Sequence, residues 1–211
     1  MPDYRALLAN CPMIGEEFTV VGADRVRNLT RVLVNGFNIE LLEKPEIIAN
    51  NLGAFKGKTL HTTDLIVRNV AETQFNDIEM LASEIAELLS FATSSPVWKF
   101  GYDFGGKGIN NQVIGQIAHF SPAIDTVRGD AIRSFIEKTW VKYHNLRTRR
   151  KVNLAFYYYV FSQQNGQPME LLLIASFVLL ESLKHNFALD SGYPFIRGFF
   201  RLKGAMVTKP G

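Results

Sequence analysis

A dense group of basic side chains lies near the start of the C-terminal third, and aromatic side chains follow it directly. The basic cluster consists of Lys142, Arg147, Arg149, Arg150 and Lys151, and the aromatic residues are Phe156, Tyr157, Tyr158, Tyr159 and Phe161. Basic side chains can contact a phosphate backbone while aromatic rings stack on bases, which suits single-stranded nucleic acid. The pattern therefore predicts contact with RNA or another single-stranded nucleic acid. It also fits a structural role, in which the aromatic residues are core residues of a helix and the basic residues pair with acidic helices.

The charge of the chain is divided unevenly along its 211 residues, although its formal net charge is only +3. Residues 1–137 contain 12 Lys plus Arg and 17 Asp plus Glu, whereas residues 138–211 contain 11 basic and 3 acidic residues. A net charge of −5 is thus joined to one of +8. Either the basic third faces phosphates or another acidic surface, or the two parts neutralise each other across an internal contact.

A glycine-rich segment, Gly101–Gly108, nearly matches the phosphate-binding pattern G-x-x-x-x-G-K-[ST]. Gly108 stands where a Ser or Thr would bind magnesium. The residues after it, Ile109–Gln112, give no firm helix start that would present N–H groups to a phosphate. The turn of a hairpin is therefore the favoured interpretation of this segment.

Side chains suited to metal binding or nucleophilic catalysis are scattered through the sequence. The histidines are His61, His119, His144 and His185, and the sole cysteine is Cys11. Their spacing is not that of metal ligands, and no nucleophile elbow is present. Glu181 and His185 are one helical turn apart, which favours a surface pair over an acid–base pair. We expect no metal, no cofactor and no self-contained catalytic signature.

The first 75 residues have a mostly β pattern. Asn35-Gly36, which suits a type I′ turn, joins Leu29–Val34 to Phe37–Leu42 in a predicted hairpin. Thr59–Val70 continues in strand fashion, while the stretch around Cys11 shows no period.

An amphipathic helix is expected at about residues 76–93. Its apolar residues follow the i, i+3, i+4, i+7 rule: Ile78, Leu81, Ala82, Ile85, Leu88, Leu89 and Ala92. Asn76 and Glu79 resemble a capping box, and Ser94-Ser95-Pro96 ends the helix. A short strand, Val97–Phe104, is expected next.

Three further helices are expected in the last third. The first is capped by Asp130, the second spans Leu146–Gln163, and the third spans Met169–Asn186. The middle of the third helix is apolar on all sides, which predicts a central position in the core. Its most apolar run, Leu171–Leu180, has ten residues where a membrane span needs about 20, so we expect no membrane contact.

Three stretches of the chain resemble the Apea-like group of HEPN proteins, a prokaryotic family in which a helical C-terminal domain follows a β-rich N-terminal domain. They are EIAELLSFATSSPVW (Glu84–Trp98), FIEKTWVKYHNLRTRRKVNLAFYYYV (Phe135–Val160) and MELLLIASFVLLESLKH (Met169–His185). The last resembles the central helix of that family. The resemblance covers about half of the chain.

The resemblance implies an RNA-directed role in phage defence or toxin systems, because many HEPN domains are metal-independent ribonucleases that assemble their site across a dimer. Their activity depends on an Arg followed after four to six residues by a His. No Arg stands five to seven positions before any His of this sequence. No catalytic residue is therefore carried over, and the chain is either non-catalytic or stops before the motif.

We expect an α+β protein: a β-rich N-terminal module (1–122), a HEPN-like helical region (123–190) and an irregular basic tail (191–211). The leading hypothesis is a non-catalytic or incomplete HEPN-like protein that binds nucleic acid. One alternative is a protein-interaction or dimerisation module, including a homodimer, without a nucleic-acid role. Another is a fragment of a ribonuclease whose catalytic helix lies beyond residue 211. The lone cysteine and the lack of a secretory signal predict a cytoplasmic location.

Overall fold

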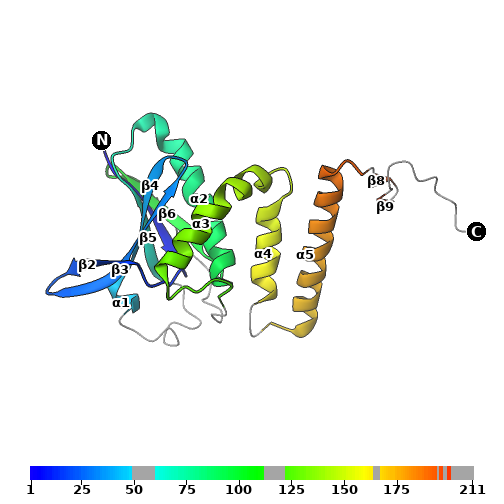
Figure 1. Ribbon diagram of the computed structural model, residues 1–211, viewed down its shortest axis with the longest axis horizontal. Coiled ribbons are helices and arrows are strands. Elements are labelled where there is room, and N and C mark those ends of the chain that lie inside the picture. The colour runs from blue at the N-terminus through cyan, green and yellow to red at the C-terminus, as the bar shows by residue number, and fades with distance from the viewer. Residues whose placement is uncertain (49–59, 112–121, 164–166, 194, 197–198, 201–211) are drawn as a thin grey trace, which may run out of the picture.

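The computed structural model describes residues 1–48, 60–111, 122–163, 167–193, 195–196 and 199–200. The predicted α+β class is confirmed: a seven-stranded antiparallel sheet occupies the N-terminal part, and helices follow (Figure 1). The strands of the sheet are β1 (Tyr4–Ala9), β2 (Glu17–Val21), β3 (Asp24–Val34), β4 (Phe37–Glu43), β5 (His61–Val67), β6 (Trp98–Phe104) and β7 (Lys107–Asn110). The helices are α1 (Pro45–Ile48), the 3-10 turn η2 (Glu72–Gln74), α2 (Phe75–Thr93), α3 (Gly129–Arg147), α4 (Val152–Ser162) and α5 (Met169–Asp190). A two-stranded pair, β8 (Phe195–Ile196) and β9 (Phe199–Phe200), follows α5.

The order of the sheet is β2-β3-β4-β5-β1-β6-β7, so the first strand of the chain lies between β5 and β6. The strand β1 is not expected from its sequence. The residues YRALLA lack β-branched side chains, and Ala, Leu and Arg favour helices, so local propensity gave no strand signal. Alternating burial nevertheless marks β1, because Tyr4, Ala6 and Leu8 are fully buried on one face of the sheet.

Both predicted hairpins form. Asn35 and Gly36 have φ values of 51° and 78° between β3 and β4, as a type I′ turn requires. Gly105 and Gly106 have φ values of 61° and 78° between β6 and β7. The glycine-rich segment is therefore the hairpin that was expected of it, and its residues pair in a β-ladder instead of leading into a helix.

One hydrophobic core joins the sheet to the helices. The predicted apolar face of α2 is buried in full, and α3 packs on β3. Ile132 and Ile136 of α3 belong to the same buried cluster as Leu41 and Leu65 of the sheet. The core is therefore continuous across residue 122, where the sequence analysis divided the chain.

The expected caps of α2 and α3 are wrong. The helix α2 begins one residue before Asn76, and Glu79 bonds to Tyr4 and Lys99 instead of closing a capping box. In α3, Arg128 is the N-cap residue, and Asp130 lies in the first turn, 2.6 Å from Arg128 Nη2. An acidic residue suits the position of Asp130, since the first turn of a helix favours negative charge even without a cap bond.

The helices α4 and α5 form an antiparallel hairpin beside the body formed by the sheet, α2 and α3. Figure 1 shows α4 between α5 and that body, with α5 outermost. The predicted central position of α5 is wrong: its buried residues are Ala175, Asn186 and Ala188. A helix that is apolar on all sides is normally buried on all sides. In this structure α4 covers only one side of α5.

Candidate functional site

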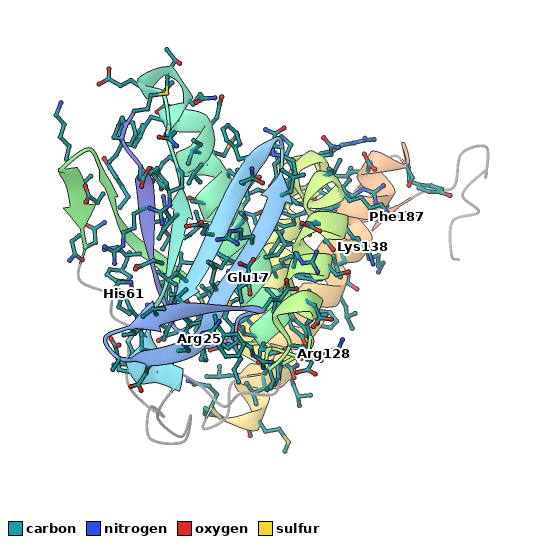
Figure 2. The ribbon with its side chains drawn as sticks, turned by 60° about the vertical axis from the view of Figure 1, so that its left-hand side comes forward. Glu17, Arg25, His61, Arg128, Lys138 and Phe187 are labelled. Carbon is teal, nitrogen blue, oxygen red and sulfur yellow. The ribbon has the colours of Figure 1, made fainter. Side chains whose placement is uncertain are left out.

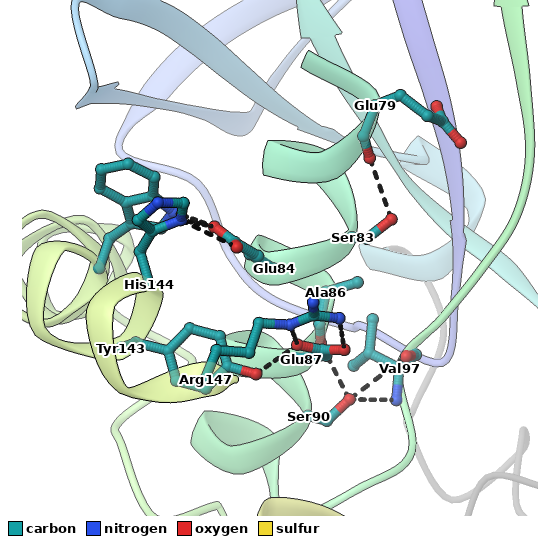
Figure 3. Close-up of polar contacts among 11 residues, drawn as sticks. Glu79, Ser83, Glu84, Ala86, Glu87, Ser90, Val97, Tyr143, His144 and Arg147 are labelled. Atoms are coloured by element: carbon teal, nitrogen blue, oxygen red, sulfur yellow. Dashed lines mark hydrogen bonds and ion pairs between the residues drawn. The ribbon is translucent and has the colours of Figure 1, made fainter. Parts of the chain in front are cut away.

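The basic cluster does not form one exposed patch. Arg147, at the end of α3, binds the carboxylate of Glu87 on α2 with two hydrogen bonds, Nε to Oε2 and Nη2 to Oε1, both 2.7 Å long (Figure 3). These bonds raise the pKa of the Arg147 guanidinium. Arg149 and Arg150 both pair with Asp190 at the end of α5. Three of the five predicted nucleic-acid contacts are thus engaged with carboxylates of the chain itself.

The other two members of the basic cluster face solvent. Lys142 lies on α3 and Lys151 ends the connection to α4, and both are exposed. Lys151 has a left-handed backbone, with φ of 48°, and begins α4 as its N-cap residue. This break divides the helix that was expected to span Leu146–Gln163. Lys142 and Lys151 are the described cluster members without a carboxylate partner, and the paired Arg149 is also exposed, at 65% of its side chain.

Two of the aromatic residues after the basic cluster, Phe156 and Tyr159, pack against neighbouring helices. The ring of Phe91 on α2 stacks against Phe156 with 4.7 Å between centroids and lies 4.9 Å from Tyr159. Phe156 also stacks on Tyr143 of α3. Tyr157, by contrast, is exposed. The aromatic run therefore joins α4 to α2 and α3, in agreement with the structural interpretation of the pattern.

A row of carboxylates on α2 faces polar side chains of α3 (Figure 3). The buried carboxylate of Glu84 accepts hydrogen bonds from Trp140 Nε1 at 2.9 Å and from His144 Nδ1 at 3.0 Å. The next turn repeats the arrangement, with Glu87 bound by the hydroxyl of Tyr143 and by Arg147. Burial, followed by the bond to Glu87, raises the pKa of the Tyr143 hydroxyl, so Tyr143 donates to the carboxylate.

The pair of Glu84 and His144 has the geometry of a carboxylate that orients an imidazole. An acid–base site would also need a nucleophile or a substrate cavity. Among the residues that the structure describes, His144 hydrogen-bonds to Glu84 alone, and its ring stacks on Trp140. The pair therefore joins α2 to α3. Glu84 belongs to the acidic part of the chain and His144 to the basic part, so the two parts meet at this contact.

A second buried carboxylate lies on the sheet face opposite the helices. Asp64 of β5 is bound by His61 Nε2 at 2.6 Å, by Lys44 Nζ at 3.0 Å and by Arg5. Burial by itself would raise the pKa of Asp64, but the hydrogen bonds from His61, Arg5 and Lys44 outweigh burial and lower it to about 2. Asp64 is therefore ionised at neutral pH, and it ties Arg5 of β1 and Lys44, which follows β4, to β5.

Cys11 and Glu43 are buried together near the end of β4. Burial, with the nearby Glu43, raises the pKa of the Cys11 thiol, so the thiolate is not available. Burial also raises the pKa of Glu43 to about 8, although the backbone N–H of Met13 donates to its Oε1 at 2.9 Å. In the described residues, no group of three or more His, Cys, Asp or Glu could hold a metal ion. His119 lies outside them.

The open pocket beside Arg31 and Arg68 has a volume of about 610 Å³. Both guanidinium groups in it pair with Glu40, and each has a further carboxylate partner, Glu17 for Arg31 and Asp3 for Arg68. Both arginines are thus paired with carboxylates of the chain, so the pocket has no excess of positive charge with which to bind an anion.

The helix α5 carries an apolar surface that no other described element covers. Its exposed apolar residues are Met169, Leu171, Leu173, Ile174, Phe177, Leu180, Leu183, Phe187 and Leu189. Figure 2 shows Phe187 on the side of the molecule away from His61. Of the described helices, α5 alone is long and apolar enough to cross a membrane, and only 17% of its most apolar window is buried. Contiguous exposed apolar surface is typical of regions that contact another protein or a membrane.

Comparisons with known proteins do not assign a role to this surface. No family model, no curated protein and no solved structure matches the chain. The HEPN resemblance therefore stays a prediction from the sequence, and the function has to be argued from the geometry described above.

Proposed function

We propose that this chain is a protein-interaction module whose contact surface is the outer side of the α4–α5 hairpin. The observation that carries the proposal is the exposure of α5. This helix has 22 residues, and its most apolar window has a mean hydropathy of 1.4. Only 17% of that window is buried. Leaving Leu or Phe side chains in water costs about 1.5–3 kcal/mol each relative to burial, so a partner that covers several of them gains a large free energy.

The composition of the α4–α5 hairpin favours a protein partner over a membrane. Glu181 and Lys184 form an ion pair on the exposed side of α5, within the length that a membrane span would occupy. The helix α4 has 11 residues, where a membrane-spanning helix needs about 20, so the hairpin cannot cross a membrane twice.

Nucleic-acid binding through the basic cluster has less support. Arg147 and Arg150 are largely covered and bound to carboxylates, and the exposed Arg149 shares its charge with Asp190. The RNA-directed role that the HEPN resemblance implies remains a proposal of the sequence, and any such contact would have to begin with Lys142 and Lys151.

Site-specific photo-cross-linking in the native cells tests the proposal. Phe177, which is 65% exposed on α5, is replaced by p-benzoylphenylalanine, and Val20, which is 74% exposed on the β2–β3 hairpin, is the control position. We expect Phe177 to give a discrete protein adduct and Val20 to give none of the same mass. The absence of a protein adduct at Phe177, together with flotation of the chain on phospholipid vesicles, would overturn the proposal.

A further inference from the structure

The outer side of α5 carries a heptad seam. We use this name for Met169, Leu173, Ser176, Leu180, Leu183 and Phe187, whose spacings are 4, 3, 4, 3 and 4 residues. Such spacing keeps the side chains in one narrow stripe and is typical of the a and d positions of packed helices. All members of the seam except Ser176 are large apolar side chains, and all five of these are exposed.

The seam lies to one side of the contact with α4. Ala175 and Asn186, which are buried, share the helix side about 100° around the axis from the seam. Arg150 lies over the ring of Phe187 at 5.2 Å, yet this ring stays 56% exposed. The seam is therefore open to a further helix that would pack beside the α4–α5 hairpin.

Charged residues flank the seam in a self-complementary order. In heptad notation, the d positions of the seam are Met169, Ser176 and Leu183. The residues that directly follow them, one in each heptad, are Glu170, Phe177 and Lys184. If two copies of α5 pack antiparallel, Phe177 meets Phe177 at the two-fold axis, and Glu170 of each copy lies opposite Lys184 of the other. In a parallel pair, Phe177 and Lys184 would lie beside Leu172 and Leu179 of the other copy, so no opposite charges would meet.

The antiparallel register also matches the apolar layers. It pairs Leu173 with Leu183, Phe187 with Met169, and the small Ser176 with Leu180 across the interface. Each pair occurs twice because the contact is isologous. We infer that a second copy of this chain covers the seam, with the two α5 helices antiparallel in a four-helix arrangement with both α4 helices; the inference rests on the proposed function.

The first experiment measures mass by sedimentation equilibrium on the purified 211-residue chain and compares two serine variants. We expect twice the 23.8 kDa mass of one chain. Leu180→Ser should weaken the dissociation constant roughly a hundredfold, because both copies lose a central apolar side chain. Ile174→Ser is the matched control, since Ile174 is equally apolar and 58% exposed but lies off the seam. It should leave the mass unchanged.

The second experiment is a charge swap. Glu170→Lys alone and Lys184→Glu alone each place like charges opposite one another twice, and each should weaken the dissociation constant about tenfold at low salt. The double variant Glu170→Lys/Lys184→Glu restores opposite charges and should restore the dimer. Failure of the double variant to recover would overturn the register.

Orientation is tested with cysteine variants and a short bis-maleimide. Phe177→Cys should cross-link to its copy, whereas Glu170→Cys should not, because antiparallel helices separate the two Glu170 positions by about 21 Å. The native Cys11 is fully buried and does not interfere. Equal cross-linking of both variants would indicate parallel helices and overturn the inference.

The two proposals fail in different ways. A wild-type chain that stays monomeric at 100 µM, roughly the upper range for weak dimers, overturns the dimer. If Phe177 still gives an adduct of a different mass in cells, the interaction module survives with another protein as its partner. If Phe177 gives no protein adduct, the wild-type chain is monomeric and it floats with phospholipid vesicles, both proposals are wrong.

Discussion

Arg147 holds Glu87 by two parallel hydrogen bonds of 2.7 Å, and this pair fastens the end of α3 to α2. The pair also gives a structural role to one member of the basic cluster. Arg147, one of the five residues predicted to contact nucleic acid, has an internal partner, and the two oppositely charged parts of the chain meet here.

Removing this ion pair is expected to destabilise the protein. Arg147→Ala leaves the half-buried carboxylate of Glu87 with the Tyr143 hydroxyl alone, so the free energy of unfolding should fall by about 1–2 kcal/mol. Urea denaturation at pH 7 measures the loss. Lys142→Ala, on the same helix but exposed, should change stability by less than about 0.5 kcal/mol. Equal effects of the two variants would contradict an internal role for Arg147.

Any affinity for single-stranded RNA is expected to depend on Lys142 and Lys151. If the basic cluster binds RNA, the double variant Lys142→Ala/Lys151→Ala should lower the affinity and reduce the slope of log K against log salt by about 1.4. Fluorescence anisotropy with a labelled oligonucleotide between low and moderate salt measures both. An unchanged slope would remove the cluster from consideration as a nucleic-acid site.

Glu43 should make the protein less stable in alkaline solution. Because burial raises its pKa from 4.5 to about 8, the unfolded state loses this proton first, and the free energy of unfolding falls as pH rises from about 4.5 to 8. Glu43→Gln has no proton to lose. Its stability should equal that of the wild type near pH 4 and exceed it by at least about 1 kcal/mol at pH 8. Thermal unfolding at both pH values measures the difference; a constant difference would contradict the raised pKa.

Asp64 should act in the opposite direction. Its pKa is lowered from 3.8 to about 2, so its stabilising effect is complete above pH 4 and is lost as pH falls toward 2. Asp64→Asn should lower the free energy of unfolding by about 2 kcal/mol at pH 7 and flatten the acid side of the stability profile. Asp24→Asn, at an exposed turn, is the control, and denaturant titrations at pH 7 and pH 2.5 separate the two variants.

The periodic elements could be predicted from the sequence because their signals are local. The apolar residues of α2 recur at helical spacing, and Asn35-Gly36 fixes a hairpin turn by its own backbone preference. The strand β1 could not be found in this way, since its strand conformation comes from pairing with β5 and β6, far along the chain. Tertiary pairing overrides a weak local propensity in such strands.

The candidate site was predicted only in part, for a physical reason. Periodicity shows that α5 is apolar all round, but whether this apolar surface faces the core or solvent depends on which helices lie beside it. The positions of Arg149 and Arg150 beside Asp190 depend on the same packing, since 40 residues separate Arg150 from its partner. The seam of Leu173, Leu180 and Phe187 was visible in the sequence as a 3.5-residue repeat, and that signal could have identified the surface.

The central position of β1 has a consequence for how the chain folds during its synthesis. This strand leaves the ribosome before its two neighbours, β5 and β6, which are made only with residues 61–67 and 98–104. Until then both backbone edges of β1 are unpaired, and its contacts are among the longest in sequence separation that the sheet contains. Folding is therefore expected to be slow for a chain of this size, with a delay before the sheet closes around its first strand.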